Sequence, residues 1–371
     1  MIVASIEARG YRNLLGDVSV SLDSRLTVLH GPNGAGKTNL LDALHFGLTG
    51  SSIRSGAIRN VIAFDGDTAR VEVGFFDSDG VRHTTFASVD RSGEKRSLVD
   101  GATPASTSQV PRVSLFHPDK LQIIKGPPAH RRSLIDQLTG SLYPSQSDLR
   151  NRYGRTLAQR NAQVRRVKAG EISISELEVW DQRLAQDAAP LVSSRRETCE
   201  TLVPHFVESA SSLGLEQPAM SYKPRTPAEA SEIEERLAEL RGEELGRAYV
   251  MYGPHLDDLA VKSLGKSVKQ FGSQGQQRAA VLGLLLAERS ALVSAGRASP
   301  ILLLDDVMSE LDPERRAALT TSAVAGGQVV VTATEESQVP AGGLGQSSSS
   351  IRIEAGEVDA GADPKWDSMA A

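Results

Sequence analysis

Apolar residues follow two different spacings along the chain. Near the N-terminus they alternate with polar residues, and the stretch Leu26–His30 is almost entirely apolar. Both patterns predict short strands, and the second is typical of a strand buried in a parallel sheet. From about residue 125 to residue 247 the apolar residues instead recur every three or four positions, which predicts helices. Strand patterns return in residues 301–304, 328–331 and 351–353.

This order predicts an α/β fold in which both ends of the chain build one lobe and the middle is an insert. Residues 1–125 and 246–356 are expected to form the two halves of the α/β lobe. Residues 126–245 are expected to form a separate, mainly helical lobe. Residues 357–371 are small and polar, and we expect them to be a disordered tail.

The composition limits how the protein can contact nucleic acid and in which compartment it is expected. The net charge of the 371 residues is −5, so any contact with nucleic acid must come from a local basic patch. The sequence has one cysteine, Cys199, which excludes an internal disulfide framework and fits a spectator thiol in a reducing cytosol. The N-terminus lacks the apolar core of a signal peptide, and no stretch reaches the roughly 18 apolar residues that span a bilayer. These features predict a soluble, cytoplasmic protein.

A glycine-rich segment lies between the apolar strand at Leu26–His30 and a stretch with leucines at helical spacing. It matches the P-loop pattern G-x-x-x-x-G-K-[ST] with Gly31, Pro32, Asn33, Gly34, Ala35, Gly36, Lys37 and Thr38. The glycines allow backbone N–H groups to point at phosphate oxygens, and the following helix adds the positive end of its dipole. We expect Lys37 to bind the β- and γ-phosphates of ATP and Thr38 to ligate Mg²⁺.

Two carboxylates follow the buried strand predicted at residues 301–304. A parallel α/β sheet binds its ligands at the carboxyl ends of its strands, so Asp305 and Asp306 are expected beside the P-loop. Asp305 would hold the magnesium ion, directly or through water, and Asp306 would orient and deprotonate the attacking water. Together with Lys37 they form the predicted catalytic set. A strand that ends in an acidic turn is the alternative, and the P-loop in the same chain favours the catalytic pair.

A third motif separates this chain from most P-loop proteins. Residues 271–278 precede an apolar helix, and Ser273 stands where a helix N-cap is expected. The segment resembles the signature of the ABC superfamily in the S-x-G-Q form of its DNA-repair branch. That resemblance implies that Ser273, Gly275 and Gln276 of one subunit bind the γ-phosphate of the ATP held by the other, in an ATP-dependent homodimer. A plain capped helix explains the same residues equally well.

Nearly the whole chain resembles the RecF family of ABC/SMC-type ATPases. Residues 9–13, R-G-Y-R-N, precede the P-loop at the spacing of that family, and residues 115–136 contain blocks similar to its lid segment. Residues 252–258 are similar to its G-P-H-R motif, except that Leu256 replaces the usual basic residue. The Q-loop glutamine of the family has no clear counterpart, because Gln122 falls after the expected strand.

The resemblance implies a P-loop ABC-type ATPase head with a mainly helical inserted lobe. It also implies ATP and Mg²⁺ as cofactors, weak DNA-stimulated ATPase activity with slow hydrolysis, and a nucleotide-gated dimer. Its expected partners are double-stranded and gapped DNA, junctions of single- and double-stranded DNA, and the proteins RecO and RecR, with which it would help to load the RecA recombinase. Its expected roles are DNA repair, replication-fork maintenance and the SOS response to DNA damage.

A basic segment offers the local patch that DNA binding requires. Residues 150–168 carry six arginines and one lysine, and they include no acidic residue. Apolar residues of the segment share one helical face, which would place most of the arginines on the other. Such a stripe neutralises phosphates without reading sequence. The expected DNA contacts are Arg152, Arg155, Arg160 and Arg166, and a solvated helix face is the alternative.

Three other kinds of P-loop protein fit the sequence less well. A transporter nucleotide-binding subunit would be shorter and would carry a switch histidine near Thr332, and it would usually have glutamate at Asp306. An SMC chromosome protein needs hundreds of heptad residues where this chain has residues 126–245. A P-loop kinase needs no signature motif, and it would yield a phosphorylated acceptor where an ATPase yields only ADP and phosphate.

Overall fold

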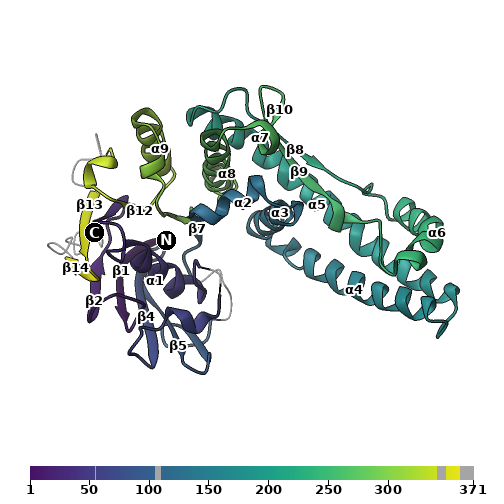
Figure 1. Cartoon of the computed structure of the whole chain (residues 1–371), viewed down its shortest axis with the longest axis horizontal. Helices are drawn as coiled ribbons and strands as arrows, with labels where there is room; N and C mark the ends of the chain where they lie inside the picture. The colour runs from purple at the N-terminus through teal and green to yellow at the C-terminus, as the bar shows by residue number, and fades with distance from the viewer. Residues whose placement is uncertain (55, 105–109, 341–347, 360–371) are drawn as a thin grey trace. The chain divides into compact units, whose positions relative to one another are not determined.

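The computed structural model describes residues 1–54, 56–104, 110–340 and 348–359 (Figure 1). Contacts within the chain divide it into two compact units. The sheet unit contains Met1–Lys120, Ser212–Gly214 and the described residues from Gly296 onward. The helical unit contains Leu121–Ser211 and Leu215–Ala295. Both ends of the chain therefore build one unit, and most of the second unit is inserted between them in sequence.

A six-stranded sheet forms one half of the sheet unit. Its order is β14 (Glu357–Asp359), β13 (Ser348–Glu354), β3 (Leu26–His30), β12 (Val329–Ala333), β11 (Ile301–Leu304) and β7 (Val113–Phe116). The strands from β13 to β7 run parallel to their neighbours, and only β14 is antiparallel. The carboxyl ends of the parallel strands consequently meet at one edge of this sheet, where a parallel α/β sheet binds ligands.

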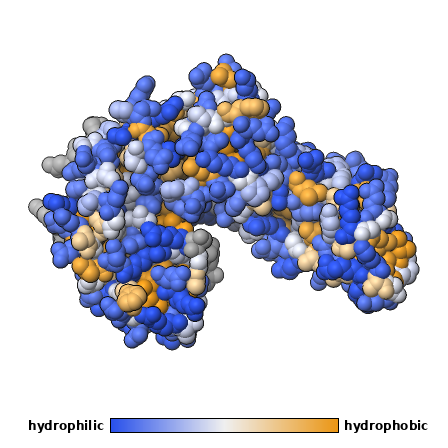
Figure 2. Space-filling view, in the orientation of Figure 1, coloured by the Kyte–Doolittle hydropathy of each residue, from blue (hydrophilic) through white to orange (hydrophobic). Residues whose placement is uncertain are grey.

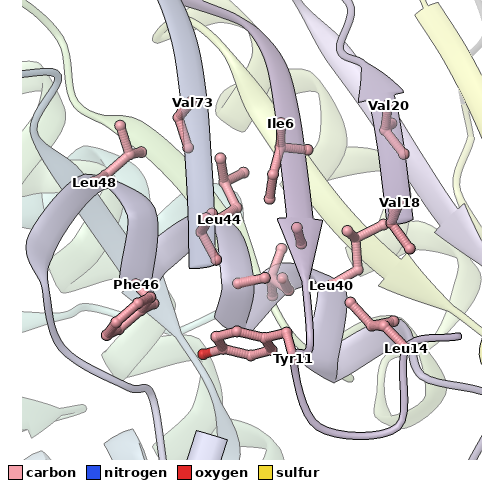
Figure 3. Close-up of a cluster of buried hydrophobic side chains, with 14 of the residues drawn as sticks. Ile6, Tyr11, Leu14, Val18, Val20, Leu40, Leu44, Phe46, Leu48 and Val73 are labelled. Carbon is pink, nitrogen blue, oxygen red and sulfur yellow. The ribbon is translucent and has the colours of Figure 1, made fainter. Parts of the chain in front are cut away.

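An antiparallel five-stranded sheet forms the other half of the unit. Its order is β2 (Asp17–Ser21), β1 (Ile2–Arg9), β4 (Thr68–Phe76), β5 (Arg82–Asp90) and β6 (Lys95–Val99). Helix α1 (Lys37–Thr49) packs on it through Leu40, Leu44 and Phe46, close to Ile6 and Val73 (Figure 3). A side chain at Gly47 would lie 2.6 Å from Val73, so this glycine permits the close approach of α1 to β4.

The helical unit is built around long helices. Its helices are α2 (Gln122–Lys125), α3 (Pro128–Leu142), α4 (Leu149–Lys168), α5 (Leu177–Ser212), α6 (Ala230–Arg247), α7 (Val268–Phe271) and α8 (Gln274–Ser294). It also holds the antiparallel strands β8 (Ala219–Lys223), β9 (Asp258–Ser263) and β10 (Lys266–Ser267). Side chains of α4, α5 and α6, among them Tyr153, Leu184 and Leu237, share one apolar cluster.

The remaining elements are short. Helix α9 (Pro313–Ala325) belongs to the sheet unit, and single turns of 3-10 helix occupy Ile58–Val61, Pro118–Leu121, Pro144–Gln146, Ile174–Glu176, Pro254–Leu256, Met308–Glu310 and Glu336–Gln338.

The visible face of the molecule is mostly hydrophilic (Figure 2). Within the described ranges, no helix has the length and apolar character needed to cross a membrane. Cys199 is buried on α5, and burial raises the pKa of its thiol to about 11, which makes it a poor nucleophile.

Two predicted boundaries differ from the structure. The expected helical lobe ended at residue 245, whereas residues 246–295 belong to the helical unit. Strand β9 pairs with β8, and Gly283 of α8 lies so close to Ala210 of α5 that a side chain there would be 2.9 Å away. The tail expected to be disordered from residue 357 begins with strand β14, which pairs with β13. Its residues 360–371 lie outside the described part of the chain.

Candidate nucleotide-binding site

The P-loop connects β3 to α1 at the carboxyl edge of the parallel sheet. Gly31, Gly34 and Gly36 have φ angles of 151°, 82° and 117°, which favour glycine over any residue with a side chain. A Cβ atom on Gly31 would lie 1.9 Å from the carbonyl oxygen of Ile353 in β13. Two of these three glycines are fixed positions of the P-loop pattern, and the loop takes the strand–loop–helix context predicted for it.

The Lys37 ammonium group lies over the loop. Its Nζ donates hydrogen bonds to the carbonyl oxygens of Gly31 at 2.6 Å and Pro32 at 2.9 Å. Burial lowers the pKa of Lys37, and the negative charges of Asp306 and Asp305 oppose that shift. The three predicted catalytic residues thus lie close enough to act on one another electrostatically.

Asp305 is the buried acidic group of the site, with 5% of its surface exposed. Its Oδ1 accepts hydrogen bonds from the hydroxyl groups of Thr38 at 2.8 Å and Thr332 at 3.0 Å. Burial raises the pKa of Asp305, whereas these two hydroxyls and the charge of Arg54 lower it. Within the described residues no cluster of three or more His, Cys, Asp or Glu could hold a metal. Mg²⁺, however, commonly uses one or two protein oxygens together with water and phosphate, and the Thr38–Asp305 pair fits that demand.

Asp306 is exposed and has an unusual backbone conformation. Its φ of 49° lies in the left-handed region, which residues with side chains rarely adopt. The Asp306 N–H donates to the Thr332 hydroxyl at 2.8 Å, and the Ser309 hydroxyl donates to its carboxylate at 2.8 Å. Two adjacent carboxylates therefore have separate environments, one buried on the Thr38 side and one exposed.

Thr332 was missed as a site residue by the sequence reasoning. It accepts from the Asp306 N–H and donates to the Asp305 carboxylate, so it fixes both acidic groups from the neighbouring strand β12. The sequence does contain a clue to this role, because Thr332 is a polar residue at the carboxyl end of an apolar strand. From the sequence alone, this position was considered only as the place where transporters carry a switch histidine.

The segment 9–13 braces the P-loop and α1. Arg12 forms an ion pair at 2.7 Å with Asp42, a fully buried residue of α1. The Asn13 side chain donates to the carbonyl oxygen of Gly34 in the P-loop at 3.4 Å and accepts from the Asn39 amide at 2.5 Å. A buried acid is stable only when it is paired and hydrogen-bonded, so Arg12 and Asp42 fix this segment to the helix.

Comparison with known proteins gives the family. Residues 2–343 match the model described as RecF/RecN/SMC N terminal domain. DNA replication and repair protein RecF of Myxococcus xanthus is 33% identical over 91% of this chain and 92% of its own length. The same protein of Streptomyces avermitilis is 34% identical over 87% of this chain and 91% of its own length. The chain belongs to the RecF family.

Solved structures agree with this assignment. A structure of the recombination mediator protein RecF with ATP in the RecFOR pathway has a TM-score of 0.81 and 25% identity, and the match covers 96% of this chain and 97% of that one. An Smc head bound to the C-terminal winged-helix domain of ScpA has a TM-score of 0.58 at 16% identity, which shows the fold. The fold is thus confirmed as the ABC-type ATPase head of RecF and SMC proteins.

The segment that resembles the ABC signature, residues 271–278, lies in the helical unit. Ser273 caps α8 as predicted, since its hydroxyl accepts from the Gln276 N–H at 3.2 Å while the Gln276 side chain accepts from the Ser273 N–H at 2.9 Å. Gly275 lies in the same first turn. Lys37 and Asp305 belong to the sheet unit.

The RecF-like lid and G-P-H blocks are connected through two buried arginines. Arg131 pairs with Asp258 at 2.6 Å, and Arg195 pairs with Asp136 at 2.7 Å and donates to the Pro254 carbonyl at 2.7 Å. The bond from Arg195 to the Pro254 carbonyl anchors the 3-10 turn Pro254–Leu256. Leu256 itself is 43% exposed, so the position where the family usually has a basic residue faces solvent here as an apolar group.

Arg160 was wrongly predicted to contact DNA. It is completely buried, and its guanidinium group pairs with Asp181 of α5 and Glu244 of α6, the latter at 2.6 Å. The segment 150–168 contains no acidic residue, but acids on the two neighbouring helices enclose this position. Helical spacing also places Arg160 seven residues after Tyr153, on the buried face.

The other three predicted DNA contacts are surface residues. Arg152 pairs with Asp187 at 2.7 Å, Arg155 with Asp148 at 3.1 Å, and Arg166 with Glu171 at 3.2 Å. All three arginine side chains are about half exposed or more. Exposed ion pairs are weak, so phosphates can compete for these arginines.

Proposed function

We propose that this chain is an ATP-dependent DNA-binding protein of recombinational repair and replication-fork maintenance. One observation carries the nucleotide part: Thr38 and Asp305, 267 residues apart in sequence, meet at 2.8 Å beside the P-loop lysine. Membership of the RecF family supports the role in repair, since the relatives are named DNA replication and repair proteins.

The ATP site is assigned from the groups that meet at the sheet edge. Residues 31–38 would wrap the phosphates with backbone N–H groups, and Lys37 would bind the β- and γ-phosphates. Thr38 and Asp305 would hold Mg²⁺, which neutralises charge on the phosphate oxygens. Asp306, exposed and held by Thr332 and Ser309, would orient the attacking water and accept its proton. Slow, DNA-stimulated hydrolysis belongs to this proposal.

The dimer would complete the site. Ser273, Gly275 and Gln276 of one subunit would bind the γ-phosphate of ATP held by the other subunit. The capping box supports this role, because it fixes the first turn of α8 with Gly275 partly exposed. The N-terminal end of a helix favours an anion, so the ATP held by one subunit would join it to the other.

Ser273→Arg is expected to leave ATP binding by the monomer unchanged and to abolish ATP-driven dimerisation. The arginine would remove the cap and place a bulky side chain where the nucleotide of the second subunit must approach. Light scattering with and without ATP measures the mass. Ser273→Thr, which keeps a capping hydroxyl, is the matched control and should dimerise. Lys37→Ala should lose both ATP binding and dimerisation. Dimers of the Ser273→Arg protein at saturating ATP would reduce the signature to a capped helix.

DNA and the recombination proteins are the proposed partners. A solved relative is described as a recombination mediator in the RecFOR pathway. For this chain we propose binding to double-stranded and gapped DNA, action with RecO and RecR, and assistance in loading RecA in the cytoplasm. Arg152, Arg155 and Arg166 on α4 are the proposed phosphate contacts.

Replacing Arg152, Arg155 and Arg166 with Gln should weaken binding to every DNA sequence tested. Each lost phosphate contact removes about 0.9 from the slope of log K against log salt on B-DNA, so the slope should flatten by roughly two to three units. DNA-binding titrations over a salt series measure it. Arg236→Gln, which removes an exposed arginine of α6 paired with Glu239, is the matched control and should keep the slope. An unchanged slope in the triple variant would assign the stripe to a solvated face.

A further inference from the structure

Phe271 is an exposed aromatic side chain on a short helix whose backbone is held in place. It ends helix α7, which leads directly into α8 (Figure 1), and 70% of its surface is exposed. Val268, at the start of α7, is buried, and its carbonyl oxygen accepts from the Gly272 N–H at 3.1 Å and from the Gln277 side chain at 3.3 Å. The backbone on both sides of the ring is therefore fixed, while the ring itself lies in solvent.

The turn between α7 and α8 also fixes the ring relative to the N-cap Ser273. A Cβ atom on Gly272 would lie 2.6 Å from the Val268 carbonyl oxygen, so a glycine is needed where the two helices meet. Lys269 donates to the Gly126 carbonyl at 2.8 Å, which fastens α7 to the end of α2. Two residues span at most about 7 Å, so the exposed ring borders the cap of the signature helix.

We propose that Phe271 packs against a second copy of this chain when ATP joins the two subunits. This inference rests on the proposed dimer, in which Ser273 of one subunit binds the γ-phosphate held by the other. A ring within about 7 Å of that serine then lies at the same interface. An aromatic ring on a fixed backbone is a residue of the kind that dominates binding energy, since little freedom is lost when it is buried. Phe271 would thus add apolar contact to the one that the phosphate makes.

The charges around Phe271 favour the nucleotide-bearing surface of a second copy. Residues 259–287 include no acidic residue and four basic ones, Lys262, Lys266, Lys269 and Arg278. The candidate nucleotide site has the opposite charge, because Asp306 and Glu310 are exposed there and ATP would add its phosphates. Complementary charges orient two surfaces as they meet. DNA phosphates would meet the same basic residues, so DNA is the other occupant that the test has to exclude.

Phe271→Ala is expected to weaken ATP-driven dimerisation roughly 25- to 900-fold and to leave ATP binding by the monomer unchanged. In a two-fold symmetric dimer each substitution acts twice, and one buried aromatic anchor contributes roughly 5- to 30-fold. Light scattering of the full-length protein over a concentration series at saturating ATP and Mg²⁺ measures the dissociation constant. Phe271→Tyr, which keeps the ring, should dimerise like the wild type. Val293→Ala, at an exposed apolar residue at the other end of α8, is the matched control and should do the same.

Phe271→Cys gives a second readout, in which a maleimide reagent measures whether ATP covers this position. Cys199, the one native cysteine, is buried, and burial raises the pKa of its thiol to about 11, so it contributes little labelling. The thiol at position 271 should react several-fold more slowly with ATP than without it, at protein concentrations where light scattering shows the dimer of this variant. Val293→Cys, about 30 Å away along α8, should react equally in both states.

The other outcomes overturn the inference, and they separate it from the proposed dimer. An unchanged dissociation constant for Phe271→Ala, or equal labelling of Phe271→Cys with and without ATP, would show that the ring stays in solvent. Protection by DNA in the absence of ATP would assign the ring to DNA. Protection by ATP at concentrations where the protein is monomeric would assign it to its own chain. If the wild-type protein forms no dimer with ATP, the proposed dimer itself fails, and this inference fails with it.

Discussion

An Asp306→Asn protein is expected to bind ATP with near wild-type affinity and to hydrolyse it roughly 10²–10⁴-fold more slowly. The amide cannot accept the proton of the attacking water, whereas a carboxylate can. The substitution suits the backbone, because Asp306 has a φ of 49° and Asn is among the residues that tolerate this conformation. The Asn oxygen can also accept the hydrogen bond that Ser309 donates. The variant therefore changes proton acceptance and little else.

Phosphate release measures the hydrolysis rate, and equilibrium dialysis measures ATP affinity. Because the ATP-bound state would persist, light scattering should show the dimer accumulating. Glu310→Gln is the matched control, since Glu310 is the exposed acid of the same 3-10 turn that holds Ser309, and it should retain turnover. Near wild-type hydrolysis by Asp306→Asn together with loss in Glu310→Gln would move the general base to Glu310.

The motifs of the candidate nucleotide site could be predicted because each of them is local in sequence. The P-loop lies between a strand and a helix that apolar spacing predicts, and its glycines take φ angles that residues with side chains rarely adopt. Asp305 follows an apolar strand, and the parallel sheet brings it to Thr38. The N-cap at Ser273 needs only its own helix, and that prediction is confirmed.

The contacts that the sequence did not reveal depend on partners far along the chain. Thr332 acts on both carboxylates only because β12 lies beside β11. The predicted end of the helical lobe at residue 245 was wrong because β9 pairs with β8 and α8 packs on α5. Pairing between elements far apart in sequence leaves no local pattern from which it could be predicted. Arg160 was assigned to the surface because its own segment contains no acidic residue. Its partners Asp181 and Glu244 come from two other helices, so the sequence of the segment did not reveal that Arg160 is buried.

Arg160→Met is expected to destabilise the helical unit by about 3–5 kcal/mol, because it leaves buried acids without their partner. Arg160 and Arg241 share Asp181, and Arg160 also pairs with Glu244, so two cations balance two anions in the native protein. Among the described residues, removal of Arg160 leaves the Glu244 carboxylate with the Met251 N–H as its one remaining hydrogen-bond donor, at 3.0 Å. Arg155→Met is the control, since its exposed pair with Asp148 should contribute no more than about 1 kcal/mol.

Trp180 offers a local probe of this unfolding, because it precedes Asp181 on α5. With Trp366 replaced by Phe, its fluorescence in a urea titration reports on the helical unit, whose transition need not coincide with that of the sheet unit. Adding Glu244→Gln to Arg160→Met should recover part of the loss, since it removes the uncompensated charge. A stability loss no greater than that of Arg155→Met would contradict the buried network. If the Arg160 variant keeps its stability but loses DNA binding, Arg160 contacts DNA directly. If it loses stability as expected, weaker DNA binding reports unfolding of the surface that carries Arg152, Arg155 and Arg166.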